Sequence, residues 1–170
     1  MHVGYQVYAV TTIRSLRPDE GLLLKRLRLD ALKDSPDSFS PLYEEYSDRD
    51  DDYWHSAAER SGATEGFDLF IAKNGHTPCG LVSGHADENR IGHIGAMWVS
   101  PVMRGKGLGK ALLNHVLGYL QHQGCQTIKL TVTETNQTAI NLYTSSGFTM
   151  TGDSEPLRKD SPLSNLEMVR

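Results

Sequence analysis

The stretch Val99–Lys110 reads Val-Ser-Pro-Val-Met-Arg-Gly-Lys-Gly-Leu-Gly-Lys and lies between a predicted strand and a predicted helix. Its glycines, at every second position from Gly105 to Gly109, have no Cβ, so main-chain N–H groups can turn toward a ligand. The start of a helix also offers free N–H groups and a partial positive charge, which suits an anion such as phosphate. Arg104 and Lys106 add positive charge in a chain that is acidic overall. We therefore expect a phosphate-binding loop here.

Spacing excludes two well-known phosphate-binding motifs. A Walker loop needs a glycine where Arg104 stands and a hydroxyl residue where Ala111 stands. A dinucleotide-binding fingerprint that began at Gly105 would need glycine at Lys110, and the strands before it are predicted to form a meander rather than a βαβ unit. What remains is the pattern Arg-x-x-Gly-x-Gly over residues 104–109.

Hydrophobic periodicity predicts a mixed α/β chain on both sides of the loop. The elements expected after the loop are a helix over 108–120, a strand over 127–132, a helix over 136–145 and closing strands over 148–151 and 166–169. Those expected before it are a strand over 5–14, a helix from Asp19 to Ser35-Pro36, and strands over 67–73, 79–87 and 92–99. Asn74-Gly75 is a strong hairpin turn. The strand–helix–strand order implies a right-handed crossover and locally parallel strands.

The sequence predicts the environment of two charged segments, the first predicted helix and the acidic stretch that follows it. In the first predicted helix, Leu24, Leu27 and Ala31 recur at helical spacing and form a core face. The basic residues expected on its outer face are Lys25, Arg26 and Arg28. The segment Glu44–Asp52 is acidic, with tyrosines and a tryptophan in and beside it. It is either a solvated face or the rim of a pocket that favours a cationic amine through its field.

Composition narrows the class of protein further. The net charge of −4 and pI of about 5.9 disfavour a nucleic-acid binder. The length of 170 residues suits one domain over residues 1–170. Met1–Thr12 lacks a basic leader with a long apolar run, and no run of about eighteen apolar residues occurs, so we expect a cytoplasmic protein without membrane association. Cys79 and Cys125 lack metal-binding spacing, and we expect no metal.

Three segments together carry a resemblance to a known family. They are the Arg-x-x-Gly-x-Gly pattern at 104–109, the segment Asn136-x-x-Ala-x-x-Leu-Tyr-x-x-x-Gly-Phe148, and an amino-terminal part, 16–39, that ends in Pro-Asp-Ser-Phe. The chain resembles the GNAT superfamily of acetyl-CoA-dependent N-acetyltransferases. The resemblance implies a central twisted, mostly antiparallel sheet that is splayed between strands 4 and 5 and flanked by helices, as a single N-acetyltransferase domain.

The resemblance also implies roles for individual residues. Acetyl-CoA would be the cosubstrate, and Asn136 would contact it near the pantetheine arm. Tyr143 would lie by the thioester sulfur and protonate the departing thiolate, although an ordinary core aromatic residue is the alternative. The main chain expected to pair with the arm belongs to Met97, Trp98 and Val99. The residues expected to hold the pyrophosphate are Arg104, Gly105, Lys106, Gly107, Leu108, Gly109 and Lys110.

The expected reaction is transfer of an acetyl group to a primary amine of a small molecule or peptide, by direct attack in a ternary complex. An alkylamine with a pKa of about 10.4 is mostly protonated at neutral pH, so a general base is useful. Glu134, which follows a predicted strand, is the first candidate and His93 the second; the favoured alternative for each is an ordinary polar residue at the surface or at a strand end. The other class of function is a non-catalytic acetyl-CoA sensor. The resemblance alone implies a possible homodimer.

Overall fold

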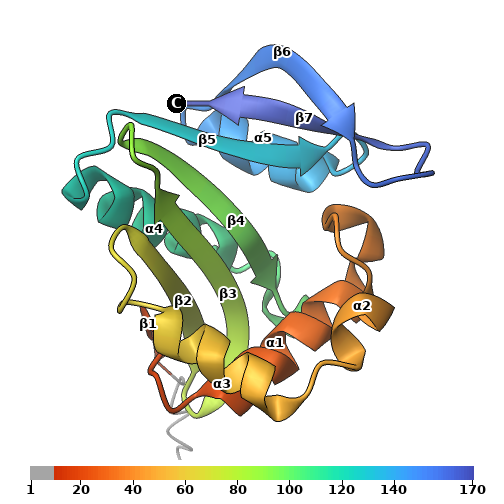
Figure 1. Ribbon diagram of the computed structural model, residues 1–170. Coiled ribbons are helices and arrows are strands. Elements are labelled where there is room, and N and C mark those ends of the chain that lie inside the picture. Colours follow the sequence, from red (N-terminus) through yellow and green to blue (C-terminus); the bar gives the residue numbers. More distant parts are fainter. Residues whose placement is uncertain (1–9) are drawn as a thin grey trace, which may run out of the picture.

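The computed structural model describes residues 10–170 and contains a mixed sheet of seven strands flanked by helices (Figure 1). The strands are β1 (Thr11–Ser15), β2 (Phe67–Asn74), β3 (Thr77–Ala86), β4 (Ile91–Val99), β5 (Thr127–Thr133), β6 (Thr149–Pro156) and β7 (Ser164–Val169), in the order β1-β2-β3-β4-β5-β7-β6. The helices are α1 (Gly21–Asp34), α2 (Tyr43–Ser47), α3 (Asp51–Arg60), α4 (Leu108–His122) and α5 (Gln137–Ser145), with 3-10 turns η1 (Pro36–Ser38) and η2 (Pro101–Met103). Among the strands of residues 10–170, only β4 and β5 pair in parallel, which confirms the expected fold class.

The observed elements follow the predicted ones except near the ends of the chain. Residues 5–9 of the first predicted strand lie outside the described residues, and β1 begins at Thr11. The closing strand predicted to end at Thr151 continues to Pro156. Every residue of β6 is exposed at the sheet edge, so the strand has no alternating pattern to reveal its length, and a proline at its end loses no ladder hydrogen bond.

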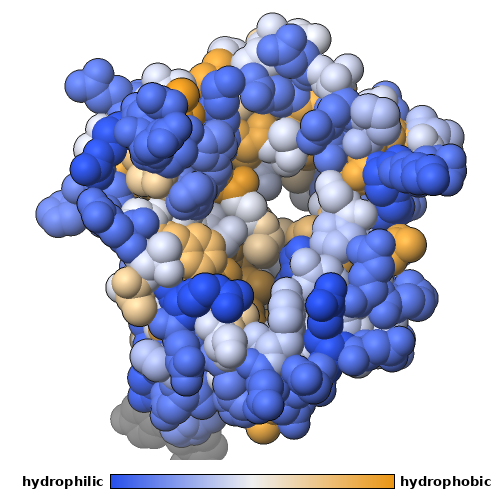
Figure 2. Space-filling view, viewed as in Figure 1, coloured by the Kyte–Doolittle hydropathy of each residue, from blue (hydrophilic) through white to orange (hydrophobic). Residues whose placement is uncertain are grey.

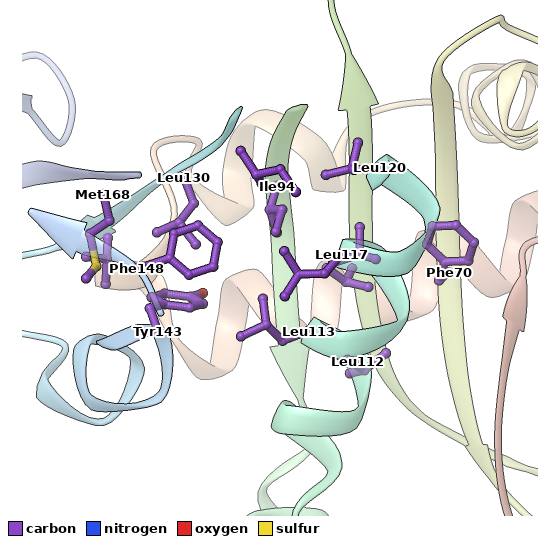
Figure 3. Packing of buried hydrophobic residues seen from close by; sticks show 14 of the residues in the cluster. Phe70, Ile94, Leu112, Leu113, Leu117, Leu120, Leu130, Tyr143, Phe148 and Met168 are labelled. Atoms are coloured by element: carbon purple, nitrogen blue, oxygen red, sulfur yellow. The ribbon is translucent and has the colours of Figure 1, made fainter. Parts of the chain in front are cut away.

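The sheet separates two layers of helices. α4 and α5 pack against one face, and α1 and α3 cover the other (Figure 1). Figure 3 shows the core under α4, where leucines of the helix meet Phe70 and Ile94. Gly84 lets α4 approach β3 closely, because a Cβ there would lie 2.7 Å from Val116 Cγ2. Within residues 10–170, no helix has both the length and the hydrophobicity to cross a membrane.

The sheet parts between β4 and β5. The two strands pair over only four residues of each, from Ile91 opposite Thr127 to Ile94 opposite Leu130. Beyond that point Ala96 has a left-handed φ of 50°, and the β3–β4 register shifts beside it. A bulge of this kind bends a strand and increases its twist, so β4 turns away from β5. This confirms the predicted splay between strands 4 and 5 (Figure 1).

We predicted that three basic residues lie on the outer face of α1, and this prediction is wrong for one of them. Lys25 and Arg26 point outward, where they pair with Asp51 and Asp30 respectively. Arg28 instead lines the space between β4 and β5. The reason is helical spacing: Arg28 lies four residues from the buried Leu24 and four from the buried Leu32, so it shares their face.

An ion pair before α1 predicts how stability depends on pH. The Glu20 carboxylate accepts hydrogen bonds from the Arg14 guanidinium at 2.7 and 2.8 Å and from the Arg17 main-chain N–H at 2.9 Å. The Arg14 hydrogen bond is the main cause that lowers the pKa of Glu20 to about 2. Because the pKa in the unfolded chain is about 4.3, the stabilisation is complete above that pH and disappears as the pH falls through 2.

We expect Glu20→Gln to lower the free energy of unfolding at neutral pH and to flatten its fall between about pH 4.3 and 2, because the variant has no carboxylate to protonate. Urea denaturation at a series of pH values measures this. The matched control is Glu65→Gln, which changes an exposed carboxylate. Parallel curves for Glu20→Gln and the unchanged protein would contradict the assignment.

Candidate active site

A cleft of about 550 Å³ lies where β4 and β5 part. Figure 2 shows the surface hollowed there. Side chains from both faces of the sheet line it, because the parted strands leave an opening through the sheet. The lining residues that the site uses are Arg28, Phe39, Met97, Val99, Asn136 and Tyr143.

The carboxyl half of β4 forms one wall of the cleft. No residue of β4 after Ile94 pairs with β5, so the edge from Gly95 to Val99 is free of sheet hydrogen bonds on the cleft side. Met97, Trp98 and Val99 all line the cleft. Met97 Sδ meets the Tyr143 hydroxyl, and the buried Trp98 packs among the residues under α1. A free strand edge can pair with an extended ligand through main-chain hydrogen bonds.

The glycine-rich loop has the conformation of an anion cradle. Gly105 and Gly107 have left-handed φ values of 72° and 83°, and a Cβ at either position would have no atom within 4 Å, so the space above them is open. Gly107 is the N-cap of α4 and has no side chain to accept the first N–H groups. Within residues 10–170, the main-chain N–H groups from Gly105 to Lys110 have no hydrogen-bond acceptor. Several free donors therefore lie together in this loop at the start of α4, where a negative group is favoured. Gly105 and Gly109 line the cleft, whereas Lys106, Gly107 and Leu108 line a second pocket beside Asn74.

The basic side chains of the loop are less free than the sequence suggests. Arg104 pairs with the Asp34 carboxylate at the end of α1, and its Nε donates to the Val99 carbonyl at 3.0 Å. Lys106 Nζ donates to the Val102 carbonyl at 2.9 Å. Arg104 therefore ties the loop to α1 and β4.

Asp34 is the acceptor that holds this corner of the site together. It also accepts from Trp98 Nε1 at 2.9 Å. Burial by itself would raise the pKa of Asp34, but hydrogen bonds from Ser35, Trp98 and Arg104 lower it overall. The carboxylate therefore stays ionised at neutral pH and fixes the position of Arg104.

Tyr143 is a buried residue of the cleft whose pKa is strongly raised. Its side chain, 8% exposed, extends from α5 toward β4 and packs edge-on beside Phe148 (Figure 3). The hydroxyl donates to Met97 Sδ at 3.7 Å, a weak partner that a better acceptor in the cleft would replace. Burial raises the pKa of Tyr143 to about 12, so the phenol is neutral at physiological pH.

Asn136 and the segment 35–41 close one side of the cleft. Asn136 Oδ1 caps α5 by accepting from the Ala139 N–H at 3.2 Å, while Nδ2 donates to Ser38 Oγ at 3.2 Å. Asn165 Nδ2 likewise donates to Ser40 Oγ at 3.3 Å. The segment 35–41 thus bridges from α1 to the β5–β7 side of the sheet. Sequence reasoning missed this bridge, because its partners lie about 100 residues away.

The two candidate bases do not line the cleft. Glu134 is exposed and accepts the Ser164 main-chain N–H at 2.9 Å. His93, also exposed, lies 3.1 Å from Asp87 Oδ2 and beside His85. Neither is brought against Tyr143, so their role stays a prediction.

The acidic segment Glu44–Asp52 forms a solvated face and not the rim of the cleft. The carboxylates of Glu44–Asp52 do not line the cleft. Asp50 caps α3 by accepting the Tyr53 N–H at 2.8 Å, and Asp51 pairs with Lys25 at 2.7 Å. The charged side chain that reaches the cleft from this side of the sheet is Arg28, a cation.

Metal chemistry has no candidate among the described residues. Within residues 10–170, no three histidine, cysteine, aspartate or glutamate side chains lie close enough together to hold an ion.

The chain is similar to several known proteins. It is 31% identical over 138 residues to a mycothiol acetyltransferase of Thermobispora bispora, covering 78% of this chain and 43% of that protein. It therefore spans less than half the length of that relative. An acetyltransferase of the GNAT family from Streptococcus pneumoniae has the same fold, with a TM-score of 0.81, 19% identity, and 95% and 99% of the two chains covered.

A second solved structure is a putative acetyltransferase from Salmonella typhimurium with its cofactor acetyl-CoA, with a TM-score of 0.76, 20% identity, and 95% and 93% of the chains covered. Residues 29–148 match the acetyltransferase (GNAT) family, a span that contains the parted strands, the glycine-rich loop and α5. The chain belongs to the acetyltransferase (GNAT) family.

Proposed function

We propose that the chain, as one N-acetyltransferase domain, transfers the acetyl group of acetyl-CoA to a primary amine of a small molecule or peptide. The observation that carries this proposal is the parting of β4 from β5, which leaves the edge from Gly95 to Val99 free beside the buried Tyr143 hydroxyl. Acetyl-CoA supplies the activated acyl group as a thioester. Family membership supports the same cosubstrate.

The strand edge and the loop fit the two parts of such a cosubstrate. The main chain of Met97, Trp98 and Val99 would pair with the amides of the pantetheine arm, and one of its N–H groups would hold the oxyanion that develops during attack. The loop from Arg104 to Lys110, with the free N–H groups described above, would hold the pyrophosphate. Asn136, fixed by its cap and by Ser38, would contact the arm.

Tyr143 would act on the departing sulfur. A phenol with a pKa of about 12 lies about 3.5 units above a thiol, so full proton transfer to a solvated thiolate costs about 4.8 kcal/mol. Burial of the thiolate in the same cleft raises its pKa too, which narrows this gap. The hydroxyl therefore helps most by donating a hydrogen bond as the C–S bond breaks, with the proton following in the same step.

Deprotonation of the amine needs a separate route. At pH 7 an amine with a pKa of about 10.4 is about 3.4 units from neutrality, which costs roughly 4.6 kcal/mol. Glu134 is the first proposed base and His93 the second. Because both are exposed and outside the cleft lining, either would act through intervening water.

Steady-state kinetics with a panel of amines tests the proposal. Thiol release is followed with polyamines, amino sugars, amino acids and peptides as acceptors, with both substrate concentrations varied. We expect turnover with at least one acceptor class and intersecting reciprocal plots, as direct attack in a ternary complex requires. Parallel plots would indicate an acetylated enzyme instead.

The same assay discriminates the rival functions. Saturable acetyl-CoA binding without turnover on any class would favour the acetyl-CoA sensor. Tight displacement of acetyl-CoA by ATP or NAD would point to a different nucleotide enzyme. Cytoplasmic location and the homodimer stay predictions, and sedimentation velocity measures the second.

A further inference from the structure

Arg28 lies at the wall of the cleft and has no hydrogen-bond or ion-pair partner within residues 10–170. Its guanidinium carbon lies 4.9 Å from the centroid of the Phe39 ring and 5.8 Å from that of Tyr46. Nη1 is enclosed and has no hydrogen-bond partner, and no carboxylate pairs with the side chain within residues 10–170. The other arginines near the cleft differ, because Arg104 pairs with Asp34 and Arg158 with Asp37.

An enclosed charge without a counter-ion is unfavourable. Burial lowers the pKa of Arg28, yet an arginine remains protonated in proteins, so the charge persists. The two aromatic faces recover part of the lost hydration through cation–π attraction, but they accept no hydrogen bond in the guanidinium plane. The donors of Arg28 other than the enclosed Nη1 are therefore available to an anion that enters the cleft.

The charge balance of the cleft selects the kind of anion. Arg28 and Arg104 are the cationic side chains that line it within residues 10–170, and Arg104 is already paired with Asp34. One uncompensated positive charge matches a monoanion better than a doubly charged phosphate. A carboxylate also fits the fork of a guanidinium, which donates two parallel hydrogen bonds to it.

We propose that Arg28 binds a carboxylate of the acceptor, so that the substrate class is an amine that also carries a carboxylate. This rests on the proposed acetyl transfer. Arg28 approaches from α1 and Tyr143 from α5, so an acceptor held at its carboxylate by Arg28 would extend its amine toward the middle of the cleft. The carboxylate would complete the hydrogen bonding of Arg28, whereas an uncharged or purely cationic amine would leave it incomplete.

Matched pairs of acceptors test the proposal. Glycine, β-alanine, 4-aminobutyrate and 6-aminohexanoate are each compared with the corresponding primary amide, at saturating acetyl-CoA. For the best length we expect kcat/KM to favour the carboxylate by about 10- to 100-fold, the range of hydrogen bonds to a charged group. In Arg28→Gln this preference should fall to within about threefold, through a loss of kcat/KM on the carboxylates.

Two control variants show that the effect belongs to this side chain. Arg26→Gln removes an exposed arginine two residues away on α1 and should keep the full preference. Arg28→Lys keeps the charge but not the fork, so it should keep part of the preference. Because Arg28 makes no hydrogen bond or ion pair within residues 10–170, Arg28→Gln loses only the contacts with Phe39 and Tyr46, and its Tm should stay close to that of the unchanged protein. A folded Arg28→Gln variant that keeps the full carboxylate preference would overturn the proposal.

Failure of the proposal is distinguishable from failure of the proposed function. Turnover of amines with no carboxylate preference, or with a preference that Arg28→Gln retains, would overturn the proposal alone. If no amine is acetylated, the proposed function fails. Calorimetric titration of the CoA-loaded protein with 4-aminobutyrate and 6-aminohexanoate then decides whether a carboxylate binds. A binding heat that is present in the unchanged protein and absent in Arg28→Gln supports the proposal. A binding heat equal to that of the corresponding amides overturns it.

Discussion

Tyr143→Phe should lower kcat by about 100-fold and leave the KM for acetyl-CoA within about threefold. The substitution removes one hydroxyl that lies 3.7 Å from Met97 Sδ and has no other hydrogen-bond partner within residues 10–170, so the packing of the ring is kept. General acid catalysis contributes about 10²- to 10⁴-fold, and the lower end applies because the phenol acts mainly as a hydrogen-bond donor. An effect on kcat without an effect on KM identifies an interaction made in the transition state.

The pH dependence of kcat gives an independent check on Tyr143. Because burial raises its pKa to about 12, its ionisation should not lower kcat anywhere below about pH 11. Tyr119→Phe is the matched control: it removes the hydroxyl of a tyrosine that packs on Phe70 outside the cleft lining, and should leave kcat unchanged. Equal activity of Tyr143→Phe and the unchanged protein would remove the proposed role.

Gly107→Val should weaken acetyl-CoA binding by at least about 100-fold, as measured by calorimetric titration. The open space above Gly107 is where the pyrophosphate would lie, and a branched side chain would fill it. The φ of 83° is also unfavourable for a branched residue, so the loop and its free N–H groups would shift. This backbone strain should cost about 1–3 kcal/mol of stability as well.

Two further glycine variants separate strain from obstruction. Gly107→Asn tolerates the left-handed conformation, so it should be stable yet still bind acetyl-CoA poorly. Gly118→Ala lies inside α4, where a Cβ meets no atom within 4 Å, and should stabilise the protein by about 0.5–1 kcal/mol with unchanged binding. Full affinity in Gly107→Val would show that the pyrophosphate lies elsewhere.

The elements that depend on local sequence patterns were predicted correctly. The periods of α1, α4 and α5 are carried by apolar residues at helical spacing, and Asn74-Gly75 marks the β2–β3 hairpin, so these elements are where they were expected. The splay was expected from the family resemblance. Its local causes, the bulge beside Leu81 and the positive φ of Ala96, depend on neighbouring strands and leave no signal in a single sequence.

Parts of the site that depend on distant partners were not predictable. Arg104 was expected to face phosphate, but its pairing with Asp34 joins residues 70 positions apart. Arg28 was placed on the outer face because a basic residue in an amphipathic helix is usually solvated. Its spacing from Leu24 and Leu32 was the available signal, and the apolar pattern alone did not reveal it.

The bridge formed by residues 35–41 has a consequence for how acceptor preference can change. The sheet joins its two halves through only four residue pairs of β4 and β5, so those pairs act as a hinge at one end of the cleft. At the other end, the hydrogen bonds of Ser38 with Asn136 and of Ser40 with Asn165 connect the two halves through the segment 35–41. The length of that segment limits how far apart the two halves of the sheet can lie. Insertion or deletion of a residue within 35–41 would therefore change the width of the cleft without changing the residues of β4, α4 and α5 that line it.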